Sequence, residues 1–311
     1  MPKNKVQFQK GFSLAQFQAY YASEEQCWQA LFKIKFPHGF CCPKCNNGSY
    51  YRVKHRQDMI CTSCKKHISL RVNTLMQNSK LPFTIWFAAI YLITQNKKSV
   101  SSLYLMRHLD VTYPTAWLLH QKITEAMSQQ EQTNLLQGII HVDDGYLGGR
   151  QSGVRGRGAS GKIPFITALS FRNNKPHQLK LSLVSRFSIK AIRSWGKRSI
   201  NTGSMIYSDA LPGFAGLARD DVTHQAVNIS KKPEEKDSLF RSINTIMGNL
   251  KRYLLGIHHA VRKESCARYL SAFAWRFNHR YGLQAAFYDG LGAIMNGIPC
   301  TREKLRVNLC R

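Results

Sequence analysis

The stretch from residue 139 to residue 149, IIHVDDGYLGG, is a short apolar run that leads directly into two adjacent aspartates and then a pair of glycines. Its composition predicts a strand that ends on Asp143 and Asp144. The chain around it is strongly basic, because 45 Lys and Arg stand against 17 Asp and Glu, for a formal net charge of +28. So large a surplus points to a polyanionic partner, and nucleic acid is the commonest one. Two acids side by side in such a chain therefore need a chemical explanation.

A second apolar run, SMIYSDALPGF, ends on Asp209 and is followed by a Pro-Gly turn. No acidic residue occurs between Gly145 and Ser208, whereas residues 150–200 contain twelve Lys and Arg. Either aspartate alone would be an ordinary turn cap. Two strand-end carboxylates in one basic domain, however, supply the oxygen ligands that Mg²⁺ or Mn²⁺ prefers, and a phosphate can complete the shell. Asp143 and Asp209 are therefore candidates for a metal site that acts on a phosphate backbone.

The segments between these aspartates predict the fold. KIPFITALSF and HQLKLSLV have the composition of strands, and SIKAIRSWGKRS that of a helix. The order strand, strand, strand, helix, strand, helix, strand, helix indicates a mixed sheet flanked by helices, the ribonuclease-H-like α/β layout. The ends of the first and fourth strands can be neighbours in such a sheet, which would unite Asp143 with Asp209.

Residues 236–255, KDSLFRSINTIMGNLKRYLL, predict a helix with one buried face. The apolar stripe consists of Leu239, Ile243, Ile246, Met247, Leu250 and Leu254. Beside it, Asn244, Gly248 and Lys251 form a second row on one side of the helix. Asn244 could offer an oxygen to a metal, Gly248 could let a phosphate backbone approach, and Lys251 could hold a phosphate. The alternative is a merely polar helix flank.

Upstream, CCPKC and CTSC form two C-x-x-C knuckles separated by fifteen residues. Cys42, Cys45, Cys61 and Cys64 can therefore surround one structural Zn²⁺, and the alternating residues between them predict a hairpin, as in a zinc ribbon. The alternatives are a chance cluster of buried cysteines or a redox pair, and Cys41 could compete with Cys42. The basic residues of this segment could contact DNA or form a solvated face: Lys44, Arg52, Lys54, Arg56, Lys65 and Lys66.

Residues 81–127 predict three helices. Pro82 stands where the first would begin, Ser99 and Ser101 offer caps for the second, and DVTYPTAW forms a turn before the third. A short helix, a tight turn and a second helix fit a helix-turn-helix that reads a major groove, although plain helix packing is the alternative. No stretch approaches the length of a membrane span, and the N-terminus lacks a signal-peptide core. We therefore expect a cytoplasmic protein, associated with a prokaryotic nucleoid, whose cysteines are thiols or metal ligands.

Taken together, these motifs resemble the zinc-ribbon branch of the DDE insertion-sequence transposases, the family numbered 1595, which has an ISXO2-like transposase domain. The resemblance covers about residues 25–282. The matching segments are CPKC, CTSC, YPTAW, DDGYLGG, IYSDALPGF and NTIMGNLKR. It implies an α+β multidomain chain with a zinc ribbon at residues 1–78 and a helix-turn-helix-like region at residues 79–130. A ribonuclease-H-like catalytic domain at residues 131–285 and a tail at residues 286–311 would follow.

The resemblance also implies roles for individual residues. Asp143 and Asp209 match the first two catalytic aspartates, Asn244 matches the third ligand position, and Lys251 matches the lysine seven residues further on. This chain has Asp144 and Asn244 where the family pattern usually has glutamate, and asparagine also occurs in the family at the latter position. Glu234 and Glu235 are second-rank candidates for a third acid.

The implied activity is that of a DNA transposase. It would bind the terminal inverted repeats of an insertion sequence and catalyse strand cleavage and strand transfer with two Mg²⁺ or Mn²⁺ ions, besides one structural Zn²⁺. Double-stranded DNA, as transposon ends and target, would be its partner, and a homodimer or larger assembly would hold two ends. Two alternatives are a transposon-derived DNA-binding protein that has lost catalysis and a metal nuclease of the same sheet architecture that does not transpose. The residues expected to contact DNA are Arg150, Arg155, Arg157, Lys162, Lys251 and Arg252.

Overall fold

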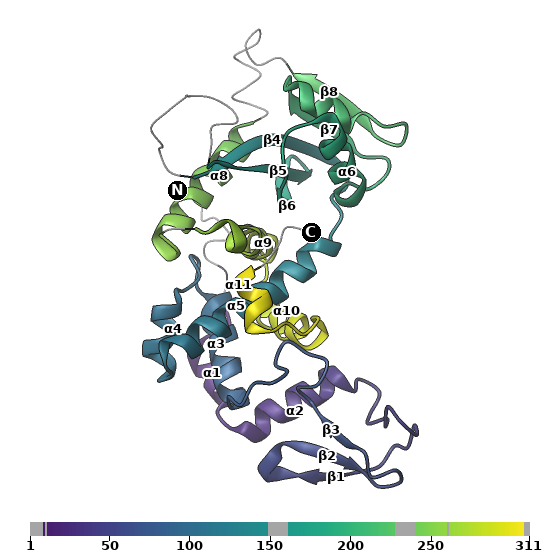
Figure 1. The fold of residues 1–311 in the computed structure, drawn as a ribbon, viewed down its shortest axis with the longest axis vertical. Helices are drawn as coiled ribbons and strands as arrows, with labels where there is room; N and C mark the ends of the chain where they lie inside the picture. Colours follow the sequence, from purple (N-terminus) through teal and green to yellow (C-terminus); the bar gives the residue numbers. More distant parts are fainter. Residues whose placement is uncertain (1–8, 10, 149–160, 228–239, 260, 308–311) are drawn as a thin grey trace. The chain divides into compact units, whose positions relative to one another are not determined.

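The computed structural model describes residues 9, 11–148, 161–227, 240–259 and 261–307 (Figure 1). The chain divides into two compact units. The first comprises Met1–Gln129 and His279–Leu305, and the second comprises Gln130–Asn278 and Arg306–Arg311. Among the described residues, no helix combines the length and apolar character that crossing a membrane requires.

The first unit opens with two capped helices and a small sheet. Ser13 and Ser23 each accept a hydrogen bond from the backbone of a glutamine three residues on, whose side chain in turn accepts from the backbone of the serine. The three strands that follow pair antiparallel in chain order, so the predicted hairpin between the cysteine knuckles is confirmed. The elements are α1 (Leu14–Tyr21), α2 (Glu24–Lys35), β1 (Tyr50–Val53), the 3₁₀ turn η1 (Lys54–Arg56), β2 (Asp58–Cys61) and β3 (His67–Ser69).

The three helices predicted for residues 81–127 are confirmed as α3 (Phe83–Gln95), α4 (Ser102–Leu109) and α5 (Tyr113–Thr133). Pro82 occupies the N-cap of α3, and Ser101 caps α4 by accepting a hydrogen bond from the Tyr104 N–H at 3.1 Å. Ser99, the other candidate cap, instead adopts a left-handed conformation with φ 65° in the turn before α4. Asp110 ends α4 with φ 50°, so only a short turn separates α4 from α5.

The C-terminal part of the first unit contains α10 (Leu283–Asn296), and α11 (Arg302–Val307) follows. The buried ring of Phe287 on α10 packs against Phe87 of α3 and against Phe12, with ring centroids 6.1 and 5.3 Å apart. The expected tail at residues 286–311 therefore includes a helix with a buried apolar face, and that face belongs to the core of the N-terminal unit.

The second unit is built on a five-stranded mixed sheet in the order β6-β5-β4-β7-β8 (Figure 1). Strands β4, β5 and β6 pair antiparallel, whereas β4 with β7 and β7 with β8 pair parallel. The first and fourth strands are thus neighbours, as the element order predicted. The elements are β4 (Ile139–Leu147), β5 (Ile163–Arg172), β6 (Lys175–Leu183), α6 (Ile189–Ser199), β7 (Met205–Asp209), the 3₁₀ helix η2 (Pro212–Leu217) and β8 (Thr223–Val227).

Two separate apolar cores cover the two faces of this sheet. Helices α8 (Arg241–Ile257) and α9 (Lys263–Asn278) pack on one face, against buried residues of β5 and β6 such as Phe165 and Leu179. Helix α6 and η2 pack on the other face, against Ile140 and Val142 of β4 and Ile206 of β7. Helix α8 is the helix predicted for residues 236–255, and residues 236–239 of that prediction lie outside the described residues.

Candidate metal centres

Three carboxylates meet where the parallel pairing of β4 with β7 ends. Strand β4 itself continues through Asp143 and Asp144 to Leu147, paired with β5, so the prediction that this strand ends on the two aspartates was wrong. One carboxylate oxygen each from Asp143, Asp144 and Asp209 can be chosen so that all three lie within 4.8 Å of one another. The strands run parallel with Val142 opposite Ser208, so Asp143 and Asp209 follow at matching positions. The buried apolar residues of both strands fix this register, because a slip by one residue would turn the aspartates to the other face. The sheet therefore brings together two acids that are 66 positions apart in the sequence.

Asp143 faces α8. Side chains alternate along a strand, so Asp143 shares a face with His141 and Gly145. Its partner on β5 is Thr167, whose hydroxyl donates a hydrogen bond to the sulfur of Met247 on α8 at 3.0 Å.

Gly145 lets α8 approach this closely. A Cβ atom at Gly145 would lie 2.5 Å from Cζ of Phe165 and 2.7 Å from Cε of Met247. Real Cβ contacts are not this short, so any other residue here would require the tips of the Met247 and Phe165 side chains to shift. The glycine in DDGY thus leaves room for the side chains that pack between α8 and the strand that carries Asp143.

Asp144 belongs to the cluster as well. Its backbone N–H donates a hydrogen bond to Oδ1 of Asp143 at 2.9 Å, and its carboxylate reaches the other two although strand alternation directs it to the opposite face. Sequence reasoning left the role of Asp144 open, and the only available signal was its place beside Asp143. On β7, the backbone N–H of Leu211 donates to Oδ1 of Asp209 at 3.3 Å and helps orient that carboxylate.

Helix α8 runs past the acidic strand. At its start, the ring of Phe240 lies 6.1 Å from that of His141, and seven residues later Met247 lies beside Gly145. Asn244 is on the turn between these two contacts. Asn244 and Lys251 are exposed and lie on the flank of α8 that borders Met247, next to the buried residues of the helix.

The remaining candidates for contact with DNA or metal are partly outside the described residues. Arg150, Arg155, Arg157, Glu234 and Glu235 all fall in residues 149–160 and 228–239. Lys162 is exposed at the start of β5. Arg252 is also exposed, and its Nε donates a hydrogen bond to the carbonyl of Gly248 at 3.2 Å.

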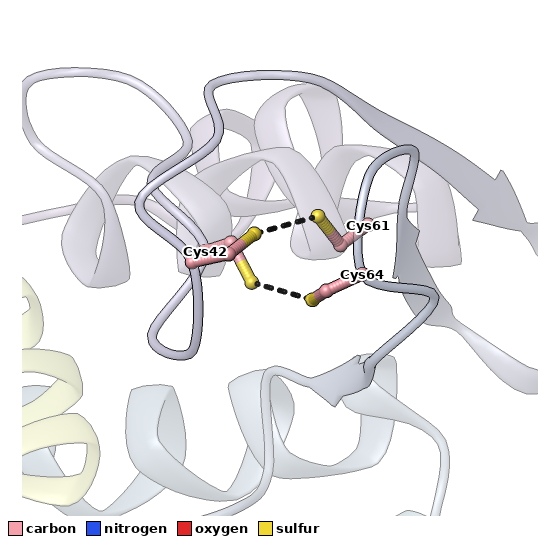
Figure 2. A group of neighbouring side chains, drawn as sticks. Cys42, Cys61 and Cys64 are labelled. Atoms are coloured by element: carbon pink, nitrogen blue, oxygen red, sulfur yellow. Dashed lines mark hydrogen bonds between the residues drawn. The ribbon is translucent and has the colours of Figure 1, made fainter.

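The second cluster consists of the four cysteines of the first unit. Cys42 Sγ lies 3.6 Å from Cys64 Sγ, and Cys45 Sγ lies 3.5 Å from Cys61 Sγ. Figure 2 shows the sulfurs of Cys42, Cys61 and Cys64 turned toward one another from two loops. Cys41 is exposed, and its Sγ lies near the carbonyl and side chain of Asn46, so Cys42 is the member of the cluster.

The two knuckles have the same backbone turn. The N–H of Asn46 donates to the carbonyl of Cys42 at 2.9 Å, and the N–H of Lys65 donates to the carbonyl of Cys61 at 3.2 Å. Both Asn46 and Lys65 adopt left-handed conformations, with φ 56° and 55°. The repeated turn directs both cysteines of each knuckle to the same point.

Each cluster fits a different metal. A tetrahedral Zn²⁺ with bonds of about 2.3 Å requires sulfurs about 3.8 Å apart, close to the spacing here. Burial raises the pKa of the Cys61 thiol, but hydrogen bonds from the Cys64 backbone and the Asn47 side chain outweigh it, so the net pKa is lowered. That favours the thiolate at Cys61, the form that binds a metal. At Cys64 a backbone hydrogen bond from Lys66 lowers the pKa, but burial and hydrogen bonds with the other three cysteines outweigh it and raise the pKa to about 11. The aspartates offer only oxygen ligands, which suit Mg²⁺ or Mn²⁺.

The basic residues of the ribbon differ in their surroundings. Arg52 forms an ion pair with Glu25 and lies over the Trp28 ring, 3.7 Å from its centroid, so it is part of the packing. Lys65 donates a hydrogen bond to the Thr62 carbonyl at 2.8 Å. The ammonium and guanidinium groups on the exposed surface are those of Lys44, Arg56 and Lys66, together with that of Lys65.

Comparison with known protein families matches both units. Residues 22–67 match a transposase zinc-ribbon domain, and residues 135–278 match an ISXO2-like transposase domain. The first match contains all four clustered cysteines, and the second contains the three clustered aspartates together with Asn244 and Lys251. No curated protein matches the chain.

Proposed function

The chain belongs to the family of insertion-sequence transposases whose zinc-ribbon and ISXO2-like transposase domains it contains, and on that premise we propose that it binds transposon ends and catalyses DNA strand cleavage and strand transfer. The observation that carries this proposal is the meeting of Asp143, Asp144 and Asp209 within 4.8 Å, just beyond the last paired residues of the parallel strands β4 and β7. The sheet consists of three antiparallel strands, β6, β5 and β4, followed by β7 and β8, which pair in parallel. This order also supports a ribonuclease-H-like catalytic domain.

The chemistry needs ligands and positioning rather than a covalent nucleophile. Divalent ions held by these carboxylates would supply activation of a water or a 3′-hydroxyl and charge stabilisation of the leaving oxygen in an in-line displacement. Asp143 and Asp209 would hold these ions. The Asp144 carboxylate adds a third negative charge to the cluster and so favours cations over neutral ligands.

Asn244 is proposed to complete the ligand set. Two contacts join α8 to β4: Phe240 lies near His141, and Met247 lies near Gly145. Asn244 lies between these contacts on the helix, and Asp143 lies between them on the strand. Four residues of helix rise about 6 Å and two residues of strand rise about 7 Å, so the two side chains lie at similar heights along these elements. Lys251, two turns further along the same flank, would orient a phosphate beside the site.

DNA recognition is proposed for the first unit. Helices α4 and α5, joined by a short turn, have the order of a helix-turn-helix, and Tyr113 at the start of α5 is 50% exposed. The cysteine cluster would hold one Zn²⁺ and thereby position the exposed cations of the ribbon, since four thiolates leave no open position for catalysis.

The proposal is tested with purified protein and DNA that carries the ends of the parent element. Wild type should cleave these ends and join them to a second duplex in Mg²⁺ or Mn²⁺, and Asp143→Ala should bind the ends equally well but leave them intact. Binding without metal-dependent cleavage by wild type would instead indicate a DNA-binding protein that has lost catalysis. Cleavage without joining of pre-cut ends would indicate a nuclease that does not transpose.

The third ligand is tested separately with Asn244→Glu and Asn244→Ala. The Ala variant should lose cleavage, and the Glu variant should retain or gain it, with tighter Mn²⁺ binding measured by calorimetry because a carboxylate replaces a neutral amide. If neither change affects cleavage or Mn²⁺ affinity, Asn244 is not a ligand and Glu234 and Glu235 become the candidates.

A further inference from the structure

Helix α6 carries a row of cations that the proposed site does not use. Lys190, Arg193 and Lys197 are spaced three and four residues apart, so they lie on one side of the helix. All three are exposed. The opposite side is buried through Ile192 and Trp195, which pack on the sheet. The cation row of α6, defined by Lys190, Arg193 and Lys197, therefore faces solvent on a rigidly held helix.

The cation row is not neutralised by nearby acids. Within the described ranges, none of its three side chains forms an ion pair. A hollow of about 540 Å³ beside the helix is lined by Ile189, Lys190, Arg193, Ser194 and Lys197, without a carboxylate. A second hollow, of about 790 Å³, adjoins Arg193 and Lys197 and also contains Asp220 and Asp221. Asp221 is paired there with Arg219 at 2.8 Å, so the acids lie at the Arg193 and Lys197 end of the row, and one of them already has a cationic partner.

The start of α6 is linked to the segments that leave the aspartate cluster. The ring of Phe187, just before the helix, lies 5.6 Å from that of Tyr146, two residues after Asp144. It also lies 6.1 Å from that of Phe214, five residues after Asp209. Gly216 packs against the first turn, where an added Cβ would be 2.3 Å from the carbonyl oxygen of Ile189. The cation row thus begins beside the chain segments that continue from the acids and runs along the face of the sheet opposite α8.

We propose that the cation row of α6 binds the phosphate backbone of the target duplex, the DNA into which a cleaved end is joined. This inference rests on the proposed function. Seven residues of helix extend about 10 Å, which matches the rise of about three base pairs along the axis of a duplex at about 3.4 Å each. The three cations have no ion-pair partner among the described residues, so they attract the negative charge of a DNA backbone.

The choice of target rather than transposon end follows from the chemistry of the row. Lys and Arg side chains that reach phosphates position a duplex without reading its sequence. A transposon end must be recognised by sequence, whereas a surface that binds any duplex suits a target of arbitrary sequence.

The test compares two matched double variants in the full-length protein. Arg193→Ala/Lys197→Ala removes two cations of the row, and Arg172→Ala/Lys175→Ala removes one arginine and one lysine that are equally exposed at the β5–β6 turn of the same unit. Binding of a duplex without end sequence is measured between 50 and 200 mM salt. Two phosphate contacts change the log-log salt slope by about 1.8, so the affinity of wild type should fall about tenfold more than that of Arg193→Ala/Lys197→Ala over this range. Arg172→Ala/Lys175→Ala should behave as wild type.

Strand transfer supplies the second readout. With pre-cut ends, Arg193→Ala/Lys197→Ala should join them to target at least about tenfold more slowly in 200 mM salt, while end binding and end cleavage stay at wild-type levels. Equal salt slopes and equal joining for this variant and wild type would overturn the inference. Loss of end binding or end cleavage in the variant would also overturn it, because the row would then hold the transposon end. If wild type itself neither cleaves nor joins, the proposed function fails, and the binding of the duplex without end sequence still decides whether the row contacts DNA.

Discussion

The cysteine cluster and the aspartate cluster each gather side chains from two chain segments, but they do so in opposite ways. The cysteines come from two identical turns fifteen residues apart, and the four thiolates complete a tetrahedral shell by themselves. The aspartates come from strands whose carboxylates are 66 positions apart, are only partly buried, and offer three groups to ions that take six oxygen ligands. The first cluster is closed and suits a structural role, whereas the second leaves positions for water and DNA.

The largest effect is expected when one ligand is removed from the cysteine cluster. Cys61→Ser removes a fully buried ligand, so bound zinc and the fold of the ribbon should both be lost, because structural Zn²⁺ binding is worth about 10 to 16 kcal/mol in small zinc domains. Zinc content by mass spectrometry and the thermal unfolding profile measure this. Cys41→Ser is the matched control and should retain one zinc per chain. A fully folded, zinc-free Cys61→Ser ribbon would show that the cluster is not structural.

Removing one carboxylate from the aspartate cluster should have the opposite effect, a loss of activity without a loss of stability. Asp209→Asn removes a proposed metal ligand, and cleavage should fall about a thousandfold, since loss of metal-assisted charge stabilisation costs several kcal/mol. The metal-free protein should unfold at the same or a higher temperature, with a gain of about 1 kcal/mol, because one of three like charges within 4.8 Å is gone. Calorimetry with and without Mn²⁺ measures both effects. A marked loss of stability in metal-free Asp209→Asn would mean that the cluster has a structural role after all.

The approach of α8 to the aspartates can be altered without touching a ligand. Gly145→Ala places a Cβ within 2.7 Å of Met247 and Phe165, so it should destabilise the protein by about 2 to 3 kcal/mol and reduce cleavage by displacing α8. Gly256→Ala on the same helix is the control, because a Cβ there meets nothing within 4 Å and alanine favours a helix. Urea unfolding and cleavage assays compare the two. Wild-type activity in Gly145→Ala would separate the position of α8 from catalysis.

Glu131 shows how a structural carboxylate differs from the clustered aspartates. It is 4% exposed and accepts a hydrogen bond from Asn278 at 3.1 Å. Burial raises the pKa of its carboxyl to about 7, against the opposing effect of that hydrogen bond. The folded protein therefore holds a proton that the unfolded chain releases, and this stabilisation is lost as pH rises from about 4.5 to about 7.

Glu131→Gln should remove that pH dependence. Between pH 5 and pH 8 the loss of unfolding free energy should be about 1 to 2 kcal/mol smaller than in wild type, while Mn²⁺ affinity and cleavage stay unchanged. Urea unfolding at both pH values measures the difference. A changed Mn²⁺ affinity would instead connect Glu131 with the metal site.

Local sequence patterns were sufficient to predict much of both clusters. The two C-x-x-C knuckles predicted the meeting of four thiols, because each knuckle makes its own turn and the hairpin between them is short. The meeting of Asp143 and Asp209 followed from the order of strands and helices, since parallel neighbours bring their carboxyl ends together. For the aspartates, the strand period of the apolar residues determined which side chains share a face.

Other features depend on contacts between distant segments and could not be predicted in this way. Strand alternation directs Asp144 away from Asp143, yet its carboxylate belongs to the same cluster, and no pattern in the sequence predicted this. The contact of Met247 with Gly145 joins residues about 100 positions apart. The packing of Phe287 on α3 is equally remote, so no pattern within residues 286–311 could show where α10 belongs.

The glycines at the base of the β4–β5 connection have a consequence for how such a protein can diversify. Gly148 and Gly161 both adopt positive φ, and a Cβ at Gly148 would lie 3.1 Å from the Gly161 carbonyl oxygen. The two ends of the connection therefore lie close together just beyond the last strand pair, Leu147 with Ile163. Insertions or deletions between these glycines would not separate the two ends, so the position of Asp143 would stay the same. The length of this connection can therefore change in evolution without moving Asp143.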